Sequence, residues 1–193
     1  MTTVRIPDWN LQGLLPPNNA VDPTSAERSP YAVSLIDFVV HFGTTKERQT
    51  ILQGLLGFRA ALHAAGLNNG FQWVDGSFLE DIEKIENRAP ADMDVVTFFY
   101  LPPGQTQRSF VLAHPDLFDH ADTKTLFHVD AYFVPLDDNP PANLVERSAY
   151  WYSLWSHRRN GQWKGYVQID LLPTDDATAS AELREAAGEG ANQ

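Results

Sequence analysis

The sequence predicts an α+β (α/β) fold in which helices flank a β-sheet of mixed strand direction. Short segments rich in β-branched and aromatic residues alternate along the chain with segments of helical periodicity. The chain has 193 residues, of which 43% are hydrophobic, and this is enough for one domain with a packed core. No internal repeat is visible, so a repeat architecture is not expected.

Three parts of the chain differ in composition. Residues 1–30 contain five prolines and no sustained periodicity, which indicates an extended arm lying over the domain. Residues 31–173 form the domain itself. Residues 174–193 hold five acidic residues and one Arg among Ala and Gly, so we expect an acidic tail that is disordered or weakly helical.

The clearest element of the first half is a helix that ends near Gly66. Thr44 and Glu47 have the spacing of a capping box, and they predict the start of this helix. Its apolar face is formed by residues three and four apart: Ile51, Leu55, Phe58 and Leu62. Residues 31–42, just before it, fit a strand or a buried helical turn, and periodicity alone does not decide between them.

The remaining elements follow from short apolar runs and their breakers. We expect strands at 71–74, 93–101, 127–134 and 162–172. We expect helices within 105–124 and over 143–158, and a short helix or loop at 78–87. Trp151 and Trp155 lie four residues apart on the last helix, which is typical of core residues, although such a pair could also stack a base or form a dimer face.

The composition excludes several classes of function. With 25 acidic and 14 basic residues, the net charge of −11 argues against a protein whose main ligand is long nucleic acid. The absence of cysteine excludes disulfides, thiolate zinc sites and cysteine nucleophiles. No run of about 18 apolar residues could span a membrane, and the N-terminal residues lack the apolar stretch of a signal peptide, so we expect a cytoplasmic protein.

One stretch has the features of a cation and phosphate site. Gly76 ends a predicted strand and leaves room for a phosphate at the backbone, while Ser77 offers a hydroxyl. Asp92 and Asp94 are one residue apart in a strongly β sequence, so their side chains share one face of a strand and can bind a hard cation together. Met93 between them is expected to point into the core.

Each of these features also has a purely structural interpretation. Ser77 with Glu80 has capping-box spacing, so Ser77 could simply cap a helix. Similarly, His114, Asp116, Asp119 and His120 resemble a metal cluster in spacing, but a solvated loop is the better interpretation because they lack a periodic frame.

The Gly76-Ser77 pair followed by Asp92-x-Asp94 resembles the signature of the DNA polymerase beta-like nucleotidyltransferase superfamily. The order of motifs over residues 6–172 is similar to that of a group of small bacterial proteins placed in it. The resemblance implies a nucleotidyltransferase-like mixed sheet in which Gly76 and Ser77 hold the nucleotide phosphates. It also implies that Asp92, Asp94 and a third carboxylate from a neighbouring strand bind divalent metal.

The third carboxylate has two candidates, and the site has one departure from the family pattern. Asp130 begins a predicted strand after a helical crossover and is preferred, while Asp170 in the last strand is the rival. Lys164 or Arg159 could neutralise phosphate charge. An acidic insert at 80–86 lengthens the gap between the two motifs, and its charge would repel a triphosphate and weaken nucleotide binding.

These expectations define a function. The resemblance implies an Mg²⁺-dependent (or Mn²⁺-dependent) nucleotidyltransferase that moves a nucleoside monophosphate from a triphosphate such as ATP to a hydroxyl of a protein, RNA or small molecule. The alternative is a noncatalytic nucleotidyltransferase-like module that binds a protein partner in a toxin–antitoxin or phage-defence system. A nucleotide-binding sensor is a third possibility, and the oligomeric state is left open.

Overall fold

A mixed five-stranded sheet forms the centre of the computed structural model, which describes residues 3–137 and 139–190. The strands in spatial order are β1 (Tyr31–Val33), β5 (Val167–Asp170), β2 (Gly70–Asp75), β3 (Met93–Phe99) and β4 (Val129–Pro135). Strand β2 runs antiparallel to both of its neighbours, whereas β3 and β4 are parallel. With eight α-helices in the described residues, the predicted α+β class is confirmed.

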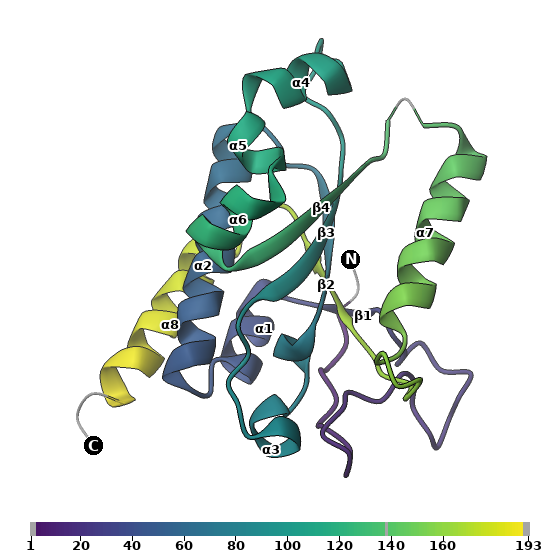
Figure 1. Cartoon of the computed structure of the whole chain (residues 1–193), viewed down its shortest axis with the longest axis vertical. Helices are drawn as coiled ribbons and strands as arrows, with labels where there is room; N and C mark the ends of the chain where they lie inside the picture. Colours follow the sequence, from purple (N-terminus) through teal and green to yellow (C-terminus); the bar gives the residue numbers. More distant parts are fainter. Residues whose placement is uncertain (1–2, 138, 191–193) are drawn as a thin grey trace.

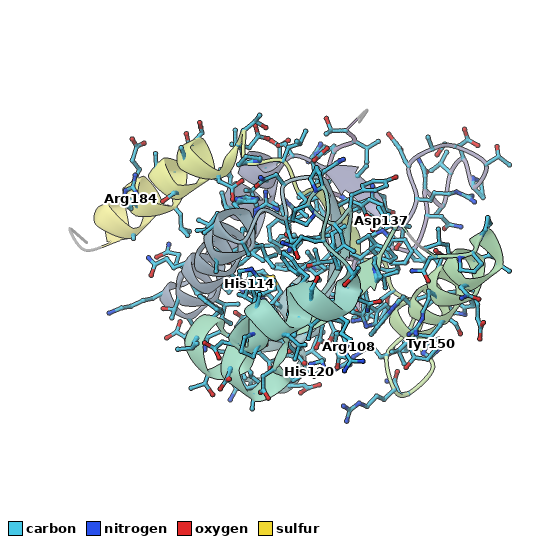
Figure 2. All side chains as sticks on the ribbon, turned by 90° about the horizontal axis from the view of Figure 1, so that it is seen from above. Arg108, His114, His120, Asp137, Tyr150 and Arg184 are labelled. Carbon is cyan, nitrogen blue, oxygen red and sulfur yellow. The ribbon has the colours of Figure 1, made fainter. Side chains whose placement is uncertain are left out.

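Helices cover the sheet unevenly. Helices α1 (Leu35–Phe42), α2 (Lys46–Ala64) and α8 (Asp176–Gly190) lie on one side, and α7 (Pro141–Trp155) stands on the other (Figure 1). Figure 2 shows the same separation, with Arg184 of α8 and Tyr150 of α7 at opposite sides of the molecule. Between β3 and β4 the chain forms three short helices: α4 (Gln107–Ala113), α5 (Pro115–Phe118) and α6 (His120–Phe127). A 3₁₀ turn, η1 (Ser77–Leu79), and α3 (Ile82–Glu86) connect β2 to β3.

The first helical region differs in detail from the prediction. Residues 31–42 contain both candidate elements, because β1 ends at Val33 and Ser34 caps α1 by accepting a hydrogen bond from the Asp37 N–H. The predicted capping box at Thr44 is wrong by one residue, since the Thr45 hydroxyl accepts from the Arg48 N–H. The apolar face of α2 is buried as predicted.

The N-terminal arm has no helix or strand among its described residues and lies against the domain. Its side chains Ile6, Leu14 and Leu15 are buried. The Val4 N–H donates to the carbonyl of Ala32 in β1 at 2.7 Å. The Leu15 carbonyl accepts from the Gly165 N–H, also at 2.7 Å. These bonds tie the arm to the end of the sheet that contains β1 and β5.

Of the two expectations for the tail, disordered or weakly helical, the helical one holds for Asp176–Gly190, which form α8, while residues 191–193 lie outside the described residues. The reason lies in a partner far away in the sequence. Arg59, which is fully buried in α2, donates from Nε and Nη2 to the two carboxylate oxygens of Asp176, each at 2.8 Å. Ala179 and Leu183 on the same helix are also buried. A charge-assisted bidentate pair and this apolar contact together hold the helix on the domain.

Within the described residues, no helix is both long enough and apolar enough to cross a membrane.

Candidate functional site

Three acidic residues lie side by side on adjacent strands. Asp94 of β3 is in register with Asp75, the last residue of β2, and with Asp130 of β4. Asp92 directly precedes β3, and Met93 between the two aspartates is completely buried, as the period of two predicts. The helical crossover from β3 to β4 makes these strands parallel and so brings Asp130 next to Asp94.

We call Asp75, Asp92, Asp94 and Asp130 the acidic row. The turn after β2 is packed against it. Gly76 has φ 93°, and a Cβ at this position would lie 2.6 Å from Oδ2 of Asp94, so only glycine fits. The alternative interpretation, in which Ser77 with Glu80 caps a helix, is wrong, because Gly76 is the N-cap of η1 and no side chain caps it. Within the described residues the Ser77 hydroxyl has no hydrogen-bond partner, so it stays free for a ligand.

A cavity of about 830 Å³ joins the turn to the acidic row. Its lining includes all six residues that the sequence indicates: Gly76, Ser77, Asp92, Asp94, Asp130 and Lys164. Its size lies in the range of pockets that bind small molecules and cofactors. The elements that converge here are separated by more than 80 residues in the chain.

The rival carboxylate, Asp170, lies elsewhere. It pairs with Phe71, near the end of β2 opposite to Asp75, so about 13 Å of strand separates it from the acidic row. Its Oδ1 accepts the N–H of Leu172 at 2.9 Å, and it does not line the cavity. Of the two candidates, Asp130 is therefore the one that the fold brings to Asp94.

Mutual repulsion and burial make it costly to ionise Asp94. Burial is the largest cause, followed by the charges of Asp75, Asp92 and Asp130, and together they raise the pKa of Asp94 to about 7. Burial also raises the pKa of Asp75 to about 6, although Lys164 beside it acts in the opposite direction. No side-chain cation within the described residues forms an ion pair with Asp94 itself.

Two of the carboxylates beside Asp94, those of Asp92 and Asp130, each pair with a basic side chain. Lys124 of α6 lies 2.6 Å from Oδ2 of Asp92, and this hydrogen bond raises the pKa of Lys124. His120, at the start of the same helix, lies 3.2 Å through Nδ1 from Oδ1 of Asp130. The solvated loop predicted for His114, Asp116, Asp119 and His120 is wrong, because Asp116 lies in α5 and His120 begins α6.

Lys164 has a different position from the one expected of a phosphate ligand. It is 5% exposed, and its Nζ lies 3.0 Å from Oδ1 of Asp75 and 3.1 Å from Oε1 of Glu80. The positive charge of Lys164 is therefore paired with two buried carboxylates of this chain. Arg159 also lines the cavity, is exposed, and forms no ion pair with the described residues.

The acidic insert is neutralised by arginines and Lys164. Glu80 pairs with Lys164 and with Arg158, whose Nε lies 3.1 Å from Oε2. Glu83 accepts two hydrogen bonds of 2.7 Å from the buried guanidinium of Arg48. Glu86 pairs with Arg158 as well. Three of the four acidic residues of the insert are therefore ion-paired, which reduces the charge that would repel a triphosphate.

The donor chemistry fits Mg²⁺, but the present arrangement is not closed around an ion. Across residues 3–137 and 139–190, no three His, Asp or Glu side chains converge on a point where they could hold a metal. The carboxylates of Asp92 and Asp130 are turned toward Lys124 and His120 instead. Hard carboxylate oxygens suit a divalent cation, and a cation here would relieve the repulsion of Asp94 by the neighbouring carboxylates, provided that Lys124 releases Asp92.

Sequence reasoning missed Asp75, Lys124 and His120. Asp75 adjoins the glycine-serine pair, but its place beside Asp94 depends on the register of β2 and β3. Lys124 and His120 reach the site through the packing of α6 against β4, for which the sequence contains no local signal.

Comparison with known proteins assigns a family without a function. Residues 7–170 match the model of a family of unknown function, DUF6932, so the chain belongs to that family. No curated protein and no solved structure gave a match.

Proposed function

We propose that this member of the family is an Mg²⁺-dependent nucleotidyltransferase that moves a nucleoside monophosphate from a triphosphate to a hydroxyl acceptor. The observation that supports this most directly is the position of Asp94, in register between Asp75 and Asp130 and in contact distance of the Gly76 turn. Such a row of carboxylates lowers the stability of the folded chain in the absence of a cation, and groups with pKa values perturbed in this way cluster at functional sites.

Asp92, Asp94 and Asp130 are the residues that would hold Mg²⁺, or Mn²⁺ in its place. When bound, the ion would neutralise phosphate charge and lower the pKa of the acceptor hydroxyl. The side chain of Lys124 is half exposed, so it can leave Asp92 without disturbing the core. In the absence of the ion, Lys124 supplies part of the missing positive charge.

The remaining parts of the cavity match the needs of phosphoryl chemistry. The free hydroxyl of Ser77 and the exposed guanidinium of Arg159 would bind the β- and γ-phosphates. The acceptor oxygen would form a bond to the α-phosphorus while the bond to the bridging oxygen breaks and pyrophosphate leaves. The acceptor proton would pass to the carboxylate of Asp130, at the edge of the row.

The test is transfer of label from each of the four α-³²P-labelled nucleoside triphosphates to components of a cell extract, with Mg²⁺ present. The double variant Asp92→Asn, Asp94→Asn is expected to abolish labelling, because it removes two of the three carboxylates that would hold the metal. Asp170→Asn is the matched control, since it removes a carboxylate from the same sheet outside the cavity. Labelling that survives the double variant would refute the proposal.

A noncatalytic binding module is the second candidate. It is favoured by the ion pairs that occupy Asp92 and Asp130 and by exposed apolar side chains on α7, namely Val145, Tyr150 and Tyr152. A protein of this kind, acting in a toxin–antitoxin or phage-defence system, would keep its biological effect in the Asp92→Asn, Asp94→Asn variant. Loss of that effect together with loss of labelling favours the enzyme.

A further inference from the structure

The cavity has two chemically different ends. The acidic row, the Gly76 turn and the basic side chains form a charged end. At the other end the lining is apolar and mostly aromatic, with Tyr132 from β4 and three residues of α7: Trp151, Leu154 and Trp155. Charged and aromatic surfaces that share one cavity suit a ligand that is itself charged at one end and planar at the other.

The two ends are continuous along β4. Tyr132 follows Asp130 by two residues, so both side chains leave the same face of the strand about 7 Å apart. The Tyr132 hydroxyl donates to Oδ2 of Asp130 at 3.4 Å. The ring of Trp151 lies 4.7 Å from that of Tyr132, centroid to centroid, and the ring of Trp155 lies 5.2 Å from Trp151. An aromatic wall therefore begins directly beside the carboxylates.

Trp151 has a hydrogen-bond donor without a partner. Its side chain is 7% exposed, and its Nε1 is buried with no acceptor among the described residues. The indole N–H groups of Trp9 and Trp73 do have partners, the Leu79 carbonyl at 2.8 Å and Oε1 of Gln168 at 2.7 Å. Buried indole N–H groups normally find an acceptor, so the unpaired donor of Trp151, a residue that lines the cavity, points to an acceptor that a ligand supplies.

We propose that this aromatic end is the binding site for the base of the nucleotide, and that Nε1 of Trp151 donates a hydrogen bond to a ring nitrogen or carbonyl oxygen of that base. The assignment rests on the proposed function for the position of the phosphates at the charged end. A nucleobase fits because it is flat, stacks on aromatic rings and has acceptor atoms along its edge.

The first experiment is equilibrium dialysis of the full chain with labelled nucleosides and nucleoside triphosphates in Mg²⁺, with tripolyphosphate as a competitor that lacks a base. At least one nucleoside is expected to bind, and its triphosphate is expected to bind at least tenfold more tightly than tripolyphosphate. Equal binding of tripolyphosphate and all four triphosphates, with no binding of any nucleoside, would overturn the proposal. This comparison uses only the natural chain and so does not depend on whether a variant folds.

The second experiment compares Trp151→Phe with Trp163→Phe. The first variant keeps a ring in the wall but removes the N–H, and loss of one hydrogen bond is expected to weaken nucleoside binding by up to about tenfold. The second makes the same change at a tryptophan that is 63% exposed and lies outside the cavity lining, and it is expected to bind as the natural chain does. Unchanged binding in Trp151→Phe, with an unchanged melting temperature, would remove Trp151 from the site.

The two proposals can fail separately. Asp92→Asn, Asp94→Asn is expected to lose transfer while it keeps nucleoside binding, because the aromatic end is intact in this variant. Nucleoside binding without any transfer by the natural chain would refute the enzyme and keep the base site. Transfer without selective binding of a base would refute the base site and keep the enzyme.

Discussion

Replacing Asp94 with Asn is expected to stabilise the chain at pH 8 in the absence of divalent cations. In the folded chain the pKa of Asp94 is raised from 3.8 to about 7, chiefly by burial and then by the neighbouring carboxylates. A shift of about 3 units corresponds to roughly 4 kcal/mol of unfavourable free energy once the folded chain is fully ionised at this position. Asparagine has nearly the same shape and no charge, so the variant avoids this cost.

The sign of the pH dependence follows from the direction of the shift. Between about pH 4 and pH 7 Asp94 is protonated in the folded chain and ionised in the unfolded chain. Unfolding then releases a proton, so stability falls as pH rises through this window and levels off above it. The advantage of Asp94→Asn should therefore be small at pH 4.5 and reach about 2 to 4 kcal/mol at pH 8.

Urea unfolding followed by tryptophan fluorescence in EDTA measures this difference at both pH values. Asp170→Asn is the control, and it is not expected to stabilise the chain, because its carboxylate accepts the Leu172 N–H. Mg²⁺ should raise the stability of the natural chain at pH 8 more than that of Asp94→Asn. The reasoning would be refuted if Asp94→Asn were no more stable than the natural chain at pH 8, and if the difference in stability between the two chains were the same at pH 4.5 and pH 8.

Two further predictions concern the tail helix and the turn. Asp176→Ala leaves the guanidinium of Arg59 buried without its carboxylate, so we expect this variant to lower the free energy of unfolding, measured in urea, by about 3 to 5 kcal/mol. The control is Glu182→Ala, at an exposed position of the same helix, which should change the free energy of unfolding by less than about 0.5 kcal/mol. Gly76→Ala places a methyl group 2.6 Å from Oδ2 of Asp94 at a φ of 93°, so we expect a loss of about 1 to 3 kcal/mol and loss of nucleotide binding in dialysis.

Each of these two predictions has a clear contrary result. If Asp176→Ala costs no more than Glu182→Ala, the pair with Arg59 does not hold α8 on the domain. If Gly76→Ala binds nucleotide as the natural chain does, the turn is not part of the phosphate site.

The parts of the fold that depend on local pattern could be predicted. The density of β-branched and aromatic side chains located β3 and β4, and the period of two along a strand placed Met93 in the core and Asp92 with Asp94 on the other side. The apolar face of α2 was equally clear. The cap of that helix was off by one residue because Thr44 and Thr45 are adjacent and either can cap it.

The parts of the fold that depend on long-range packing could not be predicted from the sequence. The stability of α8 comes from a carboxylate that meets Arg59 more than 100 residues earlier, and its own composition indicates only weak helicity. The role of Lys164 could not be read either, since a lysine before a strand can point to solvent or, as here, be buried between Asp75 and Glu80. Pairings of this kind are set by the topology and have no local sequence signal.

The N-terminal arm also protects the sheet from unwanted association. Strand β1 is at the edge of the sheet, and the donor from Val4 occupies the carbonyl of Ala32 in the middle of that strand. Unprotected strand edges are templates on which other chains can assemble into aggregates. Proteolytic removal of the arm would leave β1 open, so a clipped preparation should become turbid on storage at concentrations where the intact chain stays clear.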